Sequence, residues 1–302
     1  MKRIVALCFL LIIFQLSTST ANAQSIPDSV MQKVKAERAF YETLGKLYPA
    51  DNTVAVDEVT IAGVKSYWFN QSLLNQKEII IYLHGGGYSL GSIHSYIPMV
   101  SHFSKRLNTS VLFIEYSLAP EHPFPTQSNE VLAVYREIKK KYPTHKITIM
   151  ADSAGGGMSI TLVSNIQKSK IVAPDALVLI SAWIDLKCIN PSYVTRQALD
   201  PILTRNFAFE RTLLYAGTQI READPSELKF KEFPPVYLLV GTNEIVYDDS
   251  KNFYATIIQV QKKAKMKEYI NQTHVWPFTN INSDASAEAL KDIKEFMNTQ
   301  VK

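Results

Sequence analysis

The stretch that decides the fold is residues 147–157, ITIMADSAGGG. A run of apolar residues leads directly into Asp152 and Ser153, and small residues follow at once. Continuous apolar runs of this length are typical of strands that are covered on both faces, and small residues favour a tight turn into a helix. The sequence therefore predicts a buried strand, a sharp turn at Ser153 and a helix beginning beside it.

Short apolar runs alternate with amphipathic stretches over most of the chain. The runs that predict strands are Ile79–Leu83, Val111–Ile114, Ile147–Met150, Leu177–Ile180 and Val236–Val240. The stretches whose apolar spacing predicts helices are Tyr96–Leu107, Ser128–Lys141, Ala154–Ile166, Asp248–Lys263 and Asp284–Met297. This alternation predicts an α/β fold in which helices flank a mostly parallel central sheet.

Two segments depart from this alternation. Near the start, residues 28–47 have helical spacing, and Val54–Ile61 with Val64–Phe69 predict an antiparallel hairpin. Between the last two predicted strands lie about fifty residues with helical spacing at Thr204–Tyr215, which is more than a crossover connection needs. We expect these residues to form an insertion over the carboxyl ends of the strands, where open α/β sheets bind ligands.

The first 23 residues have the three parts of a secretory signal peptide. Lys2 and Arg3 precede an apolar run over residues 4–14, and the segment ends in Ala-Asn-Ala at 21–23. The run is shorter than the roughly 20 residues of a membrane-spanning helix. We expect cleavage after Ala23, export to the periplasm or the medium, and one mature domain over residues 24–302; an uncleaved membrane anchor is the alternative.

Stability must come from a hydrophobic core. Hydrophobic residues make up 46% of the 302-residue sequence, which excludes general disorder. The sequence has two cysteines, and loss of Cys8 with the signal peptide leaves Cys188 alone, so no internal disulfide is expected. Cys188 has no base beside it in the sequence, which favours a structural role over a nucleophilic one.

The charge of the chain is nearly balanced. Lys and Arg number 32 and Asp and Glu 28, and loss of Lys2 and Arg3 lowers the net charge from +4 to +2. This excess is too small to indicate binding to a phosphate backbone, so neither nucleic acid nor a stable membrane partner is expected. One basic cluster fits the solvated end of a helix that runs into a strand better than a polyanion patch: Lys262, Lys263, Lys265 and Lys267.

Ser153 stands where a strand meets a helix, which is the setting of a nucleophile elbow. Such a turn needs small neighbours. Ala151 replaces the first glycine of the usual G-x-S-x-G pattern, and Ala154 and Gly155 follow the serine. Because a serine also needs a base, an orienting acid and donors for an oxyanion, Ser153 is a candidate nucleophile whose partners must come from elsewhere.

The oxyanion donors are expected in residues 84–88, HGGGY, directly after a predicted strand. Consecutive glycines let backbone N–H groups approach a substrate oxygen, so Gly85 and Gly86, with the N–H of Ala154, are the predicted oxyanion hole. A phosphate-binding loop does not fit, because Leu90 stands where the third glycine of that pattern belongs. A plain flexible turn is the remaining alternative.

Three motifs in this order resemble those of the bacterial hormone-sensitive-lipase-like esterases of the α/β-hydrolase fold, from about residue 79 to 274. They are HGGG at 84–87, YSLAPEHPFP at 116–125 and DSAGG at 152–156. The resemblance implies a Ser–acid–His carboxylic-ester hydrolase that uses no cofactor or metal, with a helical cap formed by about 24–50 and about 185–232. It makes His84 and Asp152 supporting residues, and Ser117 departs from it, since Arg is common there.

The chain order of this fold is Ser, then acid, then His. Of the six histidines, His274 alone follows the last predicted strand, and the resemblance makes it the base. The family acid lies just past a strand, four residues before an Asp that opens the next helix. Glu244 fits that position, and Asp248 is then the helix-opening residue, favoured there by N-capping. Asp248 as the acid is the alternative.

These residues together predict hydrolysis of a small ester through an acyl-enzyme. The resemblance implies short acyl chains, roughly C2–C8. A lactonase, an amidase or a polysaccharide acetyl esterase would use the same machinery, and a non-catalytic small-molecule receptor is an alternative of another class. A homodimer is compatible with the sequence. The sequence contains neither H-E-x-x-H nor paired cysteines, so no metal is expected.

Overall fold

The computed structural model describes residues 26–299, so the signal peptide predicted for residues 1–23 lies outside the described residues. Within them, eight strands form one sheet in the order β1-β2-β4-β3-β5-β6-β7-β8. The strands are β1 (Val56–Ile61), β2 (Val64–Phe69), β3 (Glu78–Leu83), β4 (Ser110–Ile114), β5 (Lys146–Asp152), β6 (Ala176–Ile180), β7 (Val236–Gly241) and β8 (Lys265–Tyr269). The α-helices are α1 (Asp28–Thr43), α2 (Ile93–Leu107), α3 (Thr126–Lys141), α4 (Ser153–Lys168), α5 (Ser192–Thr195), α6 (Arg205–Ala216), α7 (Ile220–Ala223), α8 (Tyr247–Ile257), α9 (Trp276–Thr279) and α10 (Asp284–Thr299). Short 3₁₀ turns are η1 (Leu44–Lys46), η2 (Gln71–Gln76) and η3 (Pro225–Glu227).

The sheet is antiparallel at one edge and parallel elsewhere. β1 pairs with β2, and β2 with β4, in antiparallel register. The other neighbouring pairs, from β4–β3 across to β7–β8, are parallel. The predicted hairpin and the predicted mostly parallel α/β fold are therefore confirmed.

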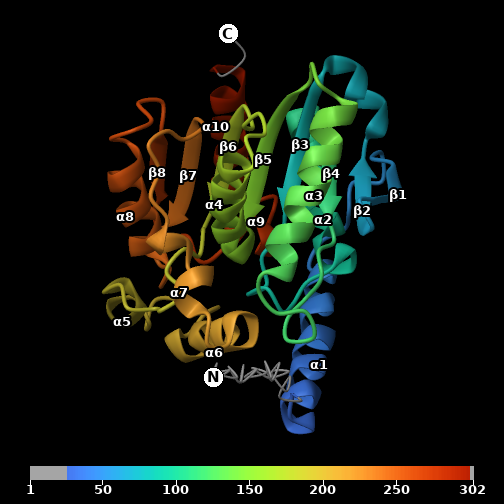
Figure 1. Ribbon diagram of the computed structural model, residues 1–302. Helices are drawn as coiled ribbons and strands as arrows, with labels where there is room; N and C mark the ends of the chain where they lie inside the picture. Colours follow the sequence, from blue (N-terminus) through green and yellow to red (C-terminus); the bar gives the residue numbers. More distant parts are fainter. Residues whose placement is uncertain (1–25, 300–302) are drawn as a thin grey trace, which may run out of the picture.

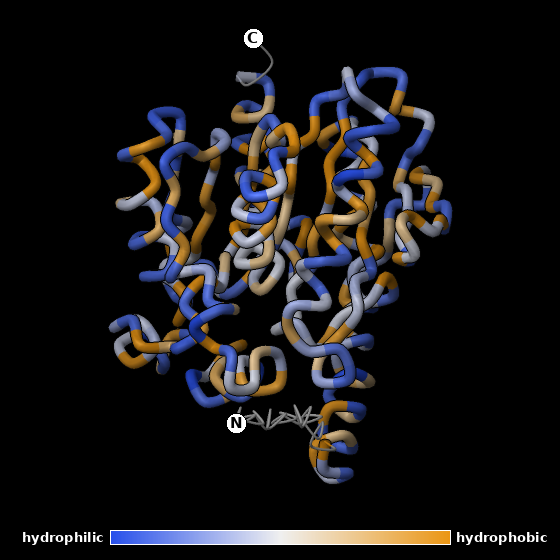
Figure 2. Tube along the Cα trace, in the orientation of Figure 1, coloured by the Kyte–Doolittle hydropathy of each residue, from blue (hydrophilic) through white to orange (hydrophobic). Residues whose placement is uncertain are grey.

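Helices cover both faces of this sheet (Figure 1). α3, α4 and α8 pack on one face, and α2, α9 and α10 pack on the other. The central strands are buried at nearly every position, which is why their sequences are continuously apolar. Figure 2 shows the central strands as mainly hydrophobic, whereas the helices that cover them carry many hydrophilic residues. No helix within residues 26–299 is both long and apolar enough to cross a bilayer.

The C-terminal side of the sheet differs from the prediction. α8 ends at Ile257 rather than at Lys263, because the Gln261 side chain donates to the Phe233 carbonyl (2.5 Å) and accepts from Lys263 N–H (3.0 Å), which closes a turn. β8 then follows, and the apolar runs did not predict it. As a half-exposed edge strand it is rich in charged residues and has no continuous apolar run.

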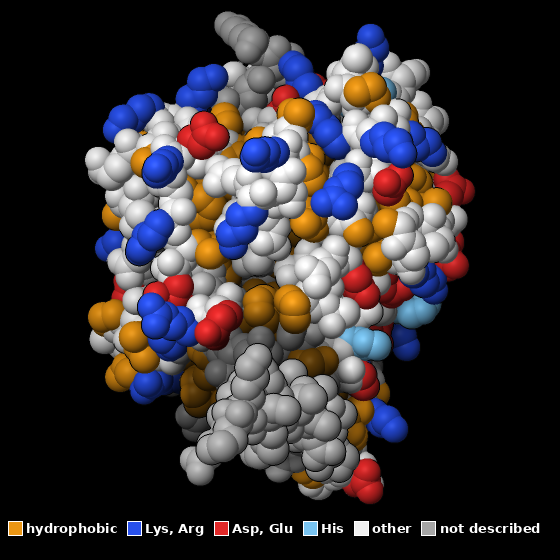
Figure 3. Space-filling view, viewed as in Figure 1, with side chains coloured by type: hydrophobic (Ala, Val, Ile, Leu, Met, Phe, Trp, Pro, Cys, Tyr) orange, Lys and Arg blue, Asp and Glu red, His pale blue; other side chains and the backbone are white. Residues whose placement is uncertain are grey.

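The residues between β6 and β7 form α5, α6, α7 and η3, which gather with α1 at the carboxyl ends of the parallel strands (Figure 1). This is the position expected for the insertion. Part of its outer surface is apolar, as the orange side chains low in Figure 3 show. The large exposed hydrophobic residues of this segment are Ile189, Val194, Leu199, Ile202, Phe209 and Leu213.

Candidate active site

Ser153 lies at the junction of β5 and α4, as the sequence predicts. Its φ is +49°, a left-handed conformation that costs a non-glycine residue about 1–3 kcal/mol. The turn is crowded: a Cβ on Gly155 would lie 2.0 Å from the Leu83 carbonyl oxygen, and one on Gly156 would lie 2.6 Å from the Cβ of Ala182. Only glycine fits at these two positions, so the run of small residues is what allows a nucleophile elbow here.

Ser153, His274 and Glu244 form one hydrogen-bonded chain, although they are far apart in the sequence. His274 Nε2 is 2.9 Å from Ser153 Oγ, and His274 Nδ1 is 3.2 Å from Glu244 Oε2. Glu244 comes from the turn after β7 and His274 from the loop after β8, so parallel strands deliver all three side chains to one edge of the sheet. This arrangement can deprotonate a serine hydroxyl and stabilise the imidazolium that results.

The charges around His274 favour its protonated form. Burial opposes protonation, but the hydrogen bond and charge of Glu244, with the charges of Asp200 and Asp152, outweigh it and raise the pKa of His274 above its ordinary value. Burial raises the pKa of Glu244, which the hydrogen bond and charge of His274 oppose. His274 therefore accepts a proton readily, and it is blocked by its own proton once the pH falls below this raised pKa.

Asp248 lies in the first turn of α8 and makes no contact with His274. Its Oδ2 accepts the N–H of Ser192 (2.8 Å), a residue of the insertion. The predicted N-capping role is wrong, because Val246 occupies the N-cap position of α8 and Asp248 follows the first helical residue. Asp248 thus holds the insertion, while Glu244 faces the imidazole.

The prediction for Gly85 needs correction. Its N–H already donates to Asp152 Oδ1 (3.1 Å) and Tyr96 Oη (3.0 Å), so it faces away from a substrate oxygen. The amides of Gly86, Gly87 and Ala154, by contrast, donate to no acceptor within residues 26–299. Gly86 and Gly87 have φ of +90° and +60°, which glycine adopts without strain. The available donors are therefore Gly86, Gly87 and Ala154, one residue further along the loop than the sequence indicated.

Asp152 holds the glycine loop through its hydrogen bond to the Gly85 amide. In addition to the Gly85 amide, its carboxylate accepts hydrogen bonds from Tyr82 Oη (2.8 Å) and Tyr96 Oη (2.9 Å). Burial raises the pKa of Asp152 to about 6, although these donors oppose that rise. A carboxylate with this many donors is well suited to keep the loop and the elbow at a fixed separation.

His84 is a structural histidine, as the resemblance implied. It is fully buried, its ring stacks on Tyr116 with centroids 4.1 Å apart, and its Nδ1 lies 2.8 Å from the Gly85 carbonyl oxygen. Burial lowers the pKa of His84 to about 4, so the ring is neutral at physiological pH. The contacts of its Nδ1 are with the Gly85 carbonyl and Tyr116 Oη rather than with Ser153 or His274, so His84 has no proton-transfer role.

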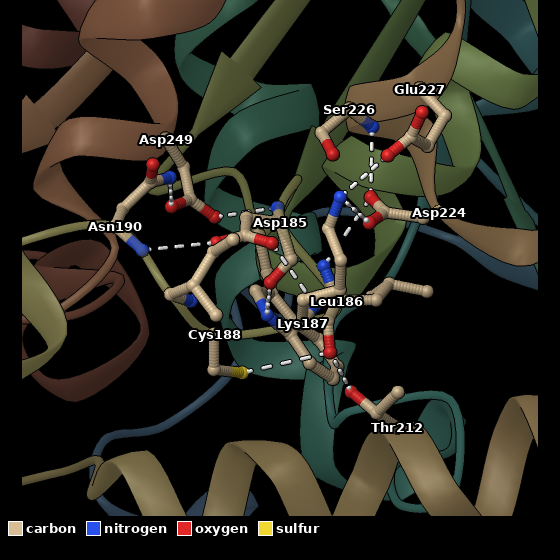
Figure 4. Close-up of polar contacts among 12 residues, drawn as sticks. Asp185, Leu186, Lys187, Cys188, Asn190, Thr212, Asp224, Ser226, Glu227 and Asp249 are labelled. Carbon is tan, nitrogen blue, oxygen red and sulfur yellow. Dashed lines mark hydrogen bonds and ion pairs between the residues drawn. The ribbon is translucent and has the colours of Figure 1, made fainter. Parts of the chain in front are cut away.

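The base of the insertion is anchored by a buried carboxylate (Figure 4). Asp249 accepts the N–H groups of Ile184 and Asp185, each at 2.9 Å, and the side-chain amide of Asn190 at 2.8 Å. Burial raises the pKa of Asp249 to about 7. The start of the insertion is thus tied to α8, the helix that follows Glu244.

Cys188 lies beside this anchor (Figure 4). The residue is buried, and its Sγ is 3.8 Å from the Leu186 carbonyl oxygen. Burial raises the pKa of the Cys188 thiol to about 12, so it is not a thiolate at neutral pH. These contacts fit the structural role that the sequence favoured.

An arginine of α6 ties the insertion to α1. Arg211 is 2% exposed, its Nη1 lies 2.9 Å from Glu37 Oε2, and it donates to Ser89 Oγ at 3.2 Å. Its side-chain methylenes cover Gly87, where a Cβ would lie 2.6 Å from Arg211 Cγ. The residues that cover the glycine loop therefore come from α6 and, through Glu37, from α1, which are far apart in the sequence.

Sequence reasoning missed several residues of this site. Gly87 had a signal, since it is the third glycine of the loop, whereas Tyr82 and Tyr96 had none because single tyrosines are common in strands and helices. Within residues 26–299, no cluster of three or more His, Cys, Asp or Glu side chains has an arrangement that could hold a metal ion.

Comparisons with known proteins point to one family. A family model described as alpha/beta hydrolase fold matches residues 80–278. An esterase of Acinetobacter venetianus is 26% identical over 275 residues, which cover 89% of this chain and 90% of the relative. An acetyl-hydrolase of Streptomyces hygroscopicus is 29% identical over 251 residues, or 81% and 83% of the two chains. The crystal structure of an esterase from the bacterial hormone-sensitive lipase family has a TM-score of 0.84 and 28% identity, and covers 89% of this chain and 92% of that one.

The chain therefore belongs to the α/β-hydrolase fold family. Its three motifs, its relatives and its structural neighbours agree on one group within that family. That group is the hormone-sensitive-lipase-like esterases, which are carboxylic-ester hydrolases.

Proposed function

We propose that the protein is a serine carboxylesterase that hydrolyses short-chain acyl esters through an acyl-enzyme. The observation that carries the proposal is the hydrogen-bonded chain from Ser153 Oγ through His274 to Glu244 at the carboxyl ends of the strands. A binding-only site has no need of a base in contact with a serine hydroxyl, so this chain favours an enzyme over a receptor.

In the proposed reaction, His274 Nε2 takes the proton of Ser153 Oγ as this oxygen attacks the ester carbonyl carbon. Glu244 keeps Nδ1 protonated and stabilises the imidazolium. The imidazolium then gives its proton to the leaving alcohol, which leaves the acyl group on Ser153. A water molecule, deprotonated by His274, releases the acid and restores the serine.

The proposed oxyanion hole consists of the amides of Gly86, Gly87 and Ala154. Among the residues that the structure describes, these N–H groups have no internal acceptor, and they flank Ser153 from the glycine loop and from the first turn of α4. Donors that are held in place before the reaction stabilise the charge on the carbonyl oxygen, and the loss of one such donor typically costs about 10²–10³-fold in kcat.

Short acyl esters are the proposed substrates, roughly C2–C8 as the sequence resemblance implies. An acetyl-hydrolase among the relatives and a similar esterase structure soaked with p-nitrophenyl butyrate support short acyl chains. The helical cap is proposed to consist of about 24–50 and about 185–232, since α1 and the insertion lie together over the site (Figure 1).

Export after cleavage at Ala23 is also proposed, on the basis of the charged, apolar and small-residue segments of the first 23 residues. Mass spectrometry of the protein expressed from its full gene measures the new N-terminus, which is expected at Gln24. A protein that retains residues 1–23 contradicts this proposal. A homodimer stays a prediction, which light scattering of the purified mature chain tests.

The decisive experiment measures hydrolysis of p-nitrophenyl esters of increasing acyl length by the native chain and by Ser153→Ala. Loss of the nucleophile is expected to lower kcat by about a millionfold. Ser164→Ala, which changes another buried serine of the same helix, is the matched control and should retain activity. Near-normal turnover by Ser153→Ala would rule out the mechanism.

A second comparison identifies the acid. Glu244→Gln removes the charge that stabilises the imidazolium, so a fall in kcat of about 10³- to 10⁴-fold is expected. Asp248→Asn, a change of the same kind four residues on, should alter kcat far less, because Asp248 contacts Ser192 rather than His274. A larger defect in Asp248→Asn would assign the acid to that residue instead.

A further inference from the structure

Ser181 is a buried serine that directly follows β6, and its backbone is fixed in an unusual conformation. Its φ is +51°, its side chain is 0% exposed, and its N–H donates to the Leu239 carbonyl of β7 at 2.8 Å. A serine gains nothing from a left-handed backbone, where glycine or asparagine is preferred. The conformation therefore needs a reason, and the contacts of the hydroxyl supply one.

The Ser181 hydroxyl joins the turn that carries Glu244 to the loop that carries His274. Its Oγ accepts the N–H of Val275, the residue next to His274, at 3.0 Å, and lies 2.8 Å from Glu244 Oε1. Because the Val275 N–H has a single hydrogen and points to Oγ, the hydroxyl hydrogen is left for the carboxylate. The direction of both hydrogen bonds is thereby determined.

Glu244 Oε1, the carboxylate oxygen that does not face His274, accepts hydrogen bonds from two donors. Glu244 Oε1 accepts from Ser181 Oγ and from the Gly241 N–H at 2.5 Å, and Oε2 is left to face His274 Nδ1. One donor comes from the end of β6 and the other from the end of β7. The carboxylate is therefore oriented by two neighbouring strands before the imidazole contacts it.

The loop that carries His274 is hydrogen-bonded to the same hydroxyl. Val275 has a φ of +47°, which is strained for a β-branched residue, and it directly follows His274. The hydrogen bond from its N–H to Ser181, together with the one that its carbonyl accepts from Phe278 N–H (2.8 Å), holds the loop in this conformation. Ser181 therefore contributes to holding the His274 ring toward Ser153.

We infer that Ser181 is a positioning residue of the esterase, which orients Glu244 and the His274 loop together through one hydroxyl group. The inference deepens the proposed function and rests on it, since the group that Ser181 positions is the proposed acid–base pair. Ser181 itself contacts neither Ser153 nor a substrate atom in the proposed reaction.

The charge of the pair gives a readout that a purely structural serine would not move. The Ser181 hydroxyl donates to Glu244 and so stabilises its anionic form. When His274 is neutral, Glu244 and His274 together carry one negative charge; when His274 is protonated, their charges cancel. Loss of the Ser181 hydroxyl, which donates to this negative charge, therefore destabilises the state with neutral His274 more than the state with protonated His274. The pair then holds its proton more tightly, and the acid limb of the kcat/KM profile moves to higher pH.

The test compares Ser181→Gly and Ser181→Ala with the native chain, using the pH dependence of kcat and KM on p-nitrophenyl acetate. Glycine removes the hydroxyl and suits a φ of +51°, so this variant separates loss of the hydroxyl from backbone strain. Ser104→Ala is the matched control, because Ser104 is equally buried and its hydroxyl bonds the Thr109 carbonyl (2.9 Å), far along α2. Circular dichroism and thermal unfolding show that each variant is folded.

We expect both Ser181 variants to lose about 10- to 100-fold in kcat, the factor that a hydrogen bond to a charged group provides, with KM changed little. The acid limb should move to higher pH in both, and Ser104→Ala should leave it in place. Folded Ser181→Gly with native kcat and an unmoved limb would overturn the inference. Should neither variant fold, Ser181→Cys, which keeps the shape but donates weakly, decides by the same two measurements.

Failure of the inference and failure of the proposed function give different results. If the native chain hydrolyses the ester and Ser153→Ala does not, the proposed function stands whatever Ser181→Gly does. If the native chain has no esterase activity, the His274 Nδ1–H proton signal in the NMR spectrum still reports on the pair. That signal should shift between the native chain and Ser181→Gly, and an unchanged signal counts against the inference.

Discussion

Three non-glycine residues in or beside the hydrogen-bonded chain from Ser153 to Glu244 take left-handed backbone conformations: Ser153, Ser181 and Val275, with φ between +47° and +51°. Each such residue costs about 1–3 kcal/mol and persists only where its surroundings over-determine it. Here the surroundings are hydrogen bonds: Trp183 N–H donates to the Ser153 carbonyl (2.9 Å), and Ser181 joins Val275 to Glu244. Hydrogen bonds therefore hold these strained residues in the conformations that place the Ser153 hydroxyl, the His274 imidazole and the Glu244 carboxylate next to one another.

The negative charge of Asp152 is predicted to move the acid limb of the kcat/KM profile to higher pH, because it raises the pKa of His274. Asp152 is one of the carboxylates that raise the pKa of His274, so Asp152→Asn should move the acid limb of kcat/KM to lower pH, opposite to Ser181→Gly. The rate should also fall, by roughly tenfold, because the loop held through Gly85 loses a charge-assisted hydrogen bond.

The pH profile of kcat/KM for Asp152→Asn measures both effects. Asp249→Asn changes another buried carboxyl group, one that is not among those that raise the pKa of His274, and as the control it should leave the acid limb where it is. A limb that moves upward in Asp152→Asn, or equally in both variants, contradicts the prediction.

Among the elements, α1 and α6 matter most for the shape of the site, although neither belongs to the sheet. α1 is fastened to the core by Arg38, which donates to both oxygens of Glu121 at 2.7 Å and to the Ala119 and Ser89 carbonyls at 2.8 Å. α6 reaches α1 through Arg211. Side chains of both helices therefore contact the glycine loop or the residues next to it.

The buried contact between these helices should stabilise the protein far more than the exposed one. Glu37→Gln leaves the Arg211 guanidinium with only a more distant carboxylate, Glu210 Oε2 at 3.8 Å from Nη2, and we expect the free energy of unfolding to fall by roughly 1–3 kcal/mol. Lys33→Ala removes the Lys33–Glu210 pair (2.6 Å), whose side chains are 54% and 48% exposed, and should cost less than about 1 kcal/mol.

Urea unfolding of both variants measures this difference, and hydrogen exchange in α1 shows whether the helix loosens. Glu37→Gln is expected to speed exchange in α1, and Lys33→Ala is not. Equal losses of stability in the two variants would show that burial of the Arg211 pair contributes nothing.

At the scale of the whole molecule, buried carboxylates make the stability depend on pH. Burial raises the pKa of Asp249 to about 7 from an ordinary value of 3.8. The folded protein therefore binds this proton more tightly than the unfolded chain. The resulting stabilisation is complete below about pH 4 and is lost as the pH rises through about 7.

Asp249→Asn removes this contribution and keeps the shape of the side chain. The free energy of unfolding of the native chain, relative to that of the variant, should fall between about pH 4 and pH 7. Urea unfolding at several pH values in this range measures the difference. A difference that stays constant, or that grows with rising pH, would show that Asp249 is ionised throughout the range.

Much of the site could be predicted because its requirements are local. An elbow needs small residues after a serine at a strand end, and the run from Ala151 to Gly157 meets that need within seven positions. Continuous apolar runs indicated the parallel strands for the same reason. β8 was missed because an edge strand is only half buried, so charged residues are tolerated along it.

The sequence by itself determined the α/β fold, the serine at the elbow and the insertion after β6, because residue size and the spacing of apolar residues act over short distances. Only the tertiary structure decided that Gly86 and Gly87, rather than Gly85, offer their amides, and that Glu244 rather than Asp248 faces His274. It also brought Ser181 to both loops. These choices depend on how the ends of separate strands align, to within a hydrogen-bond length, and no pattern along one strand carries that distance.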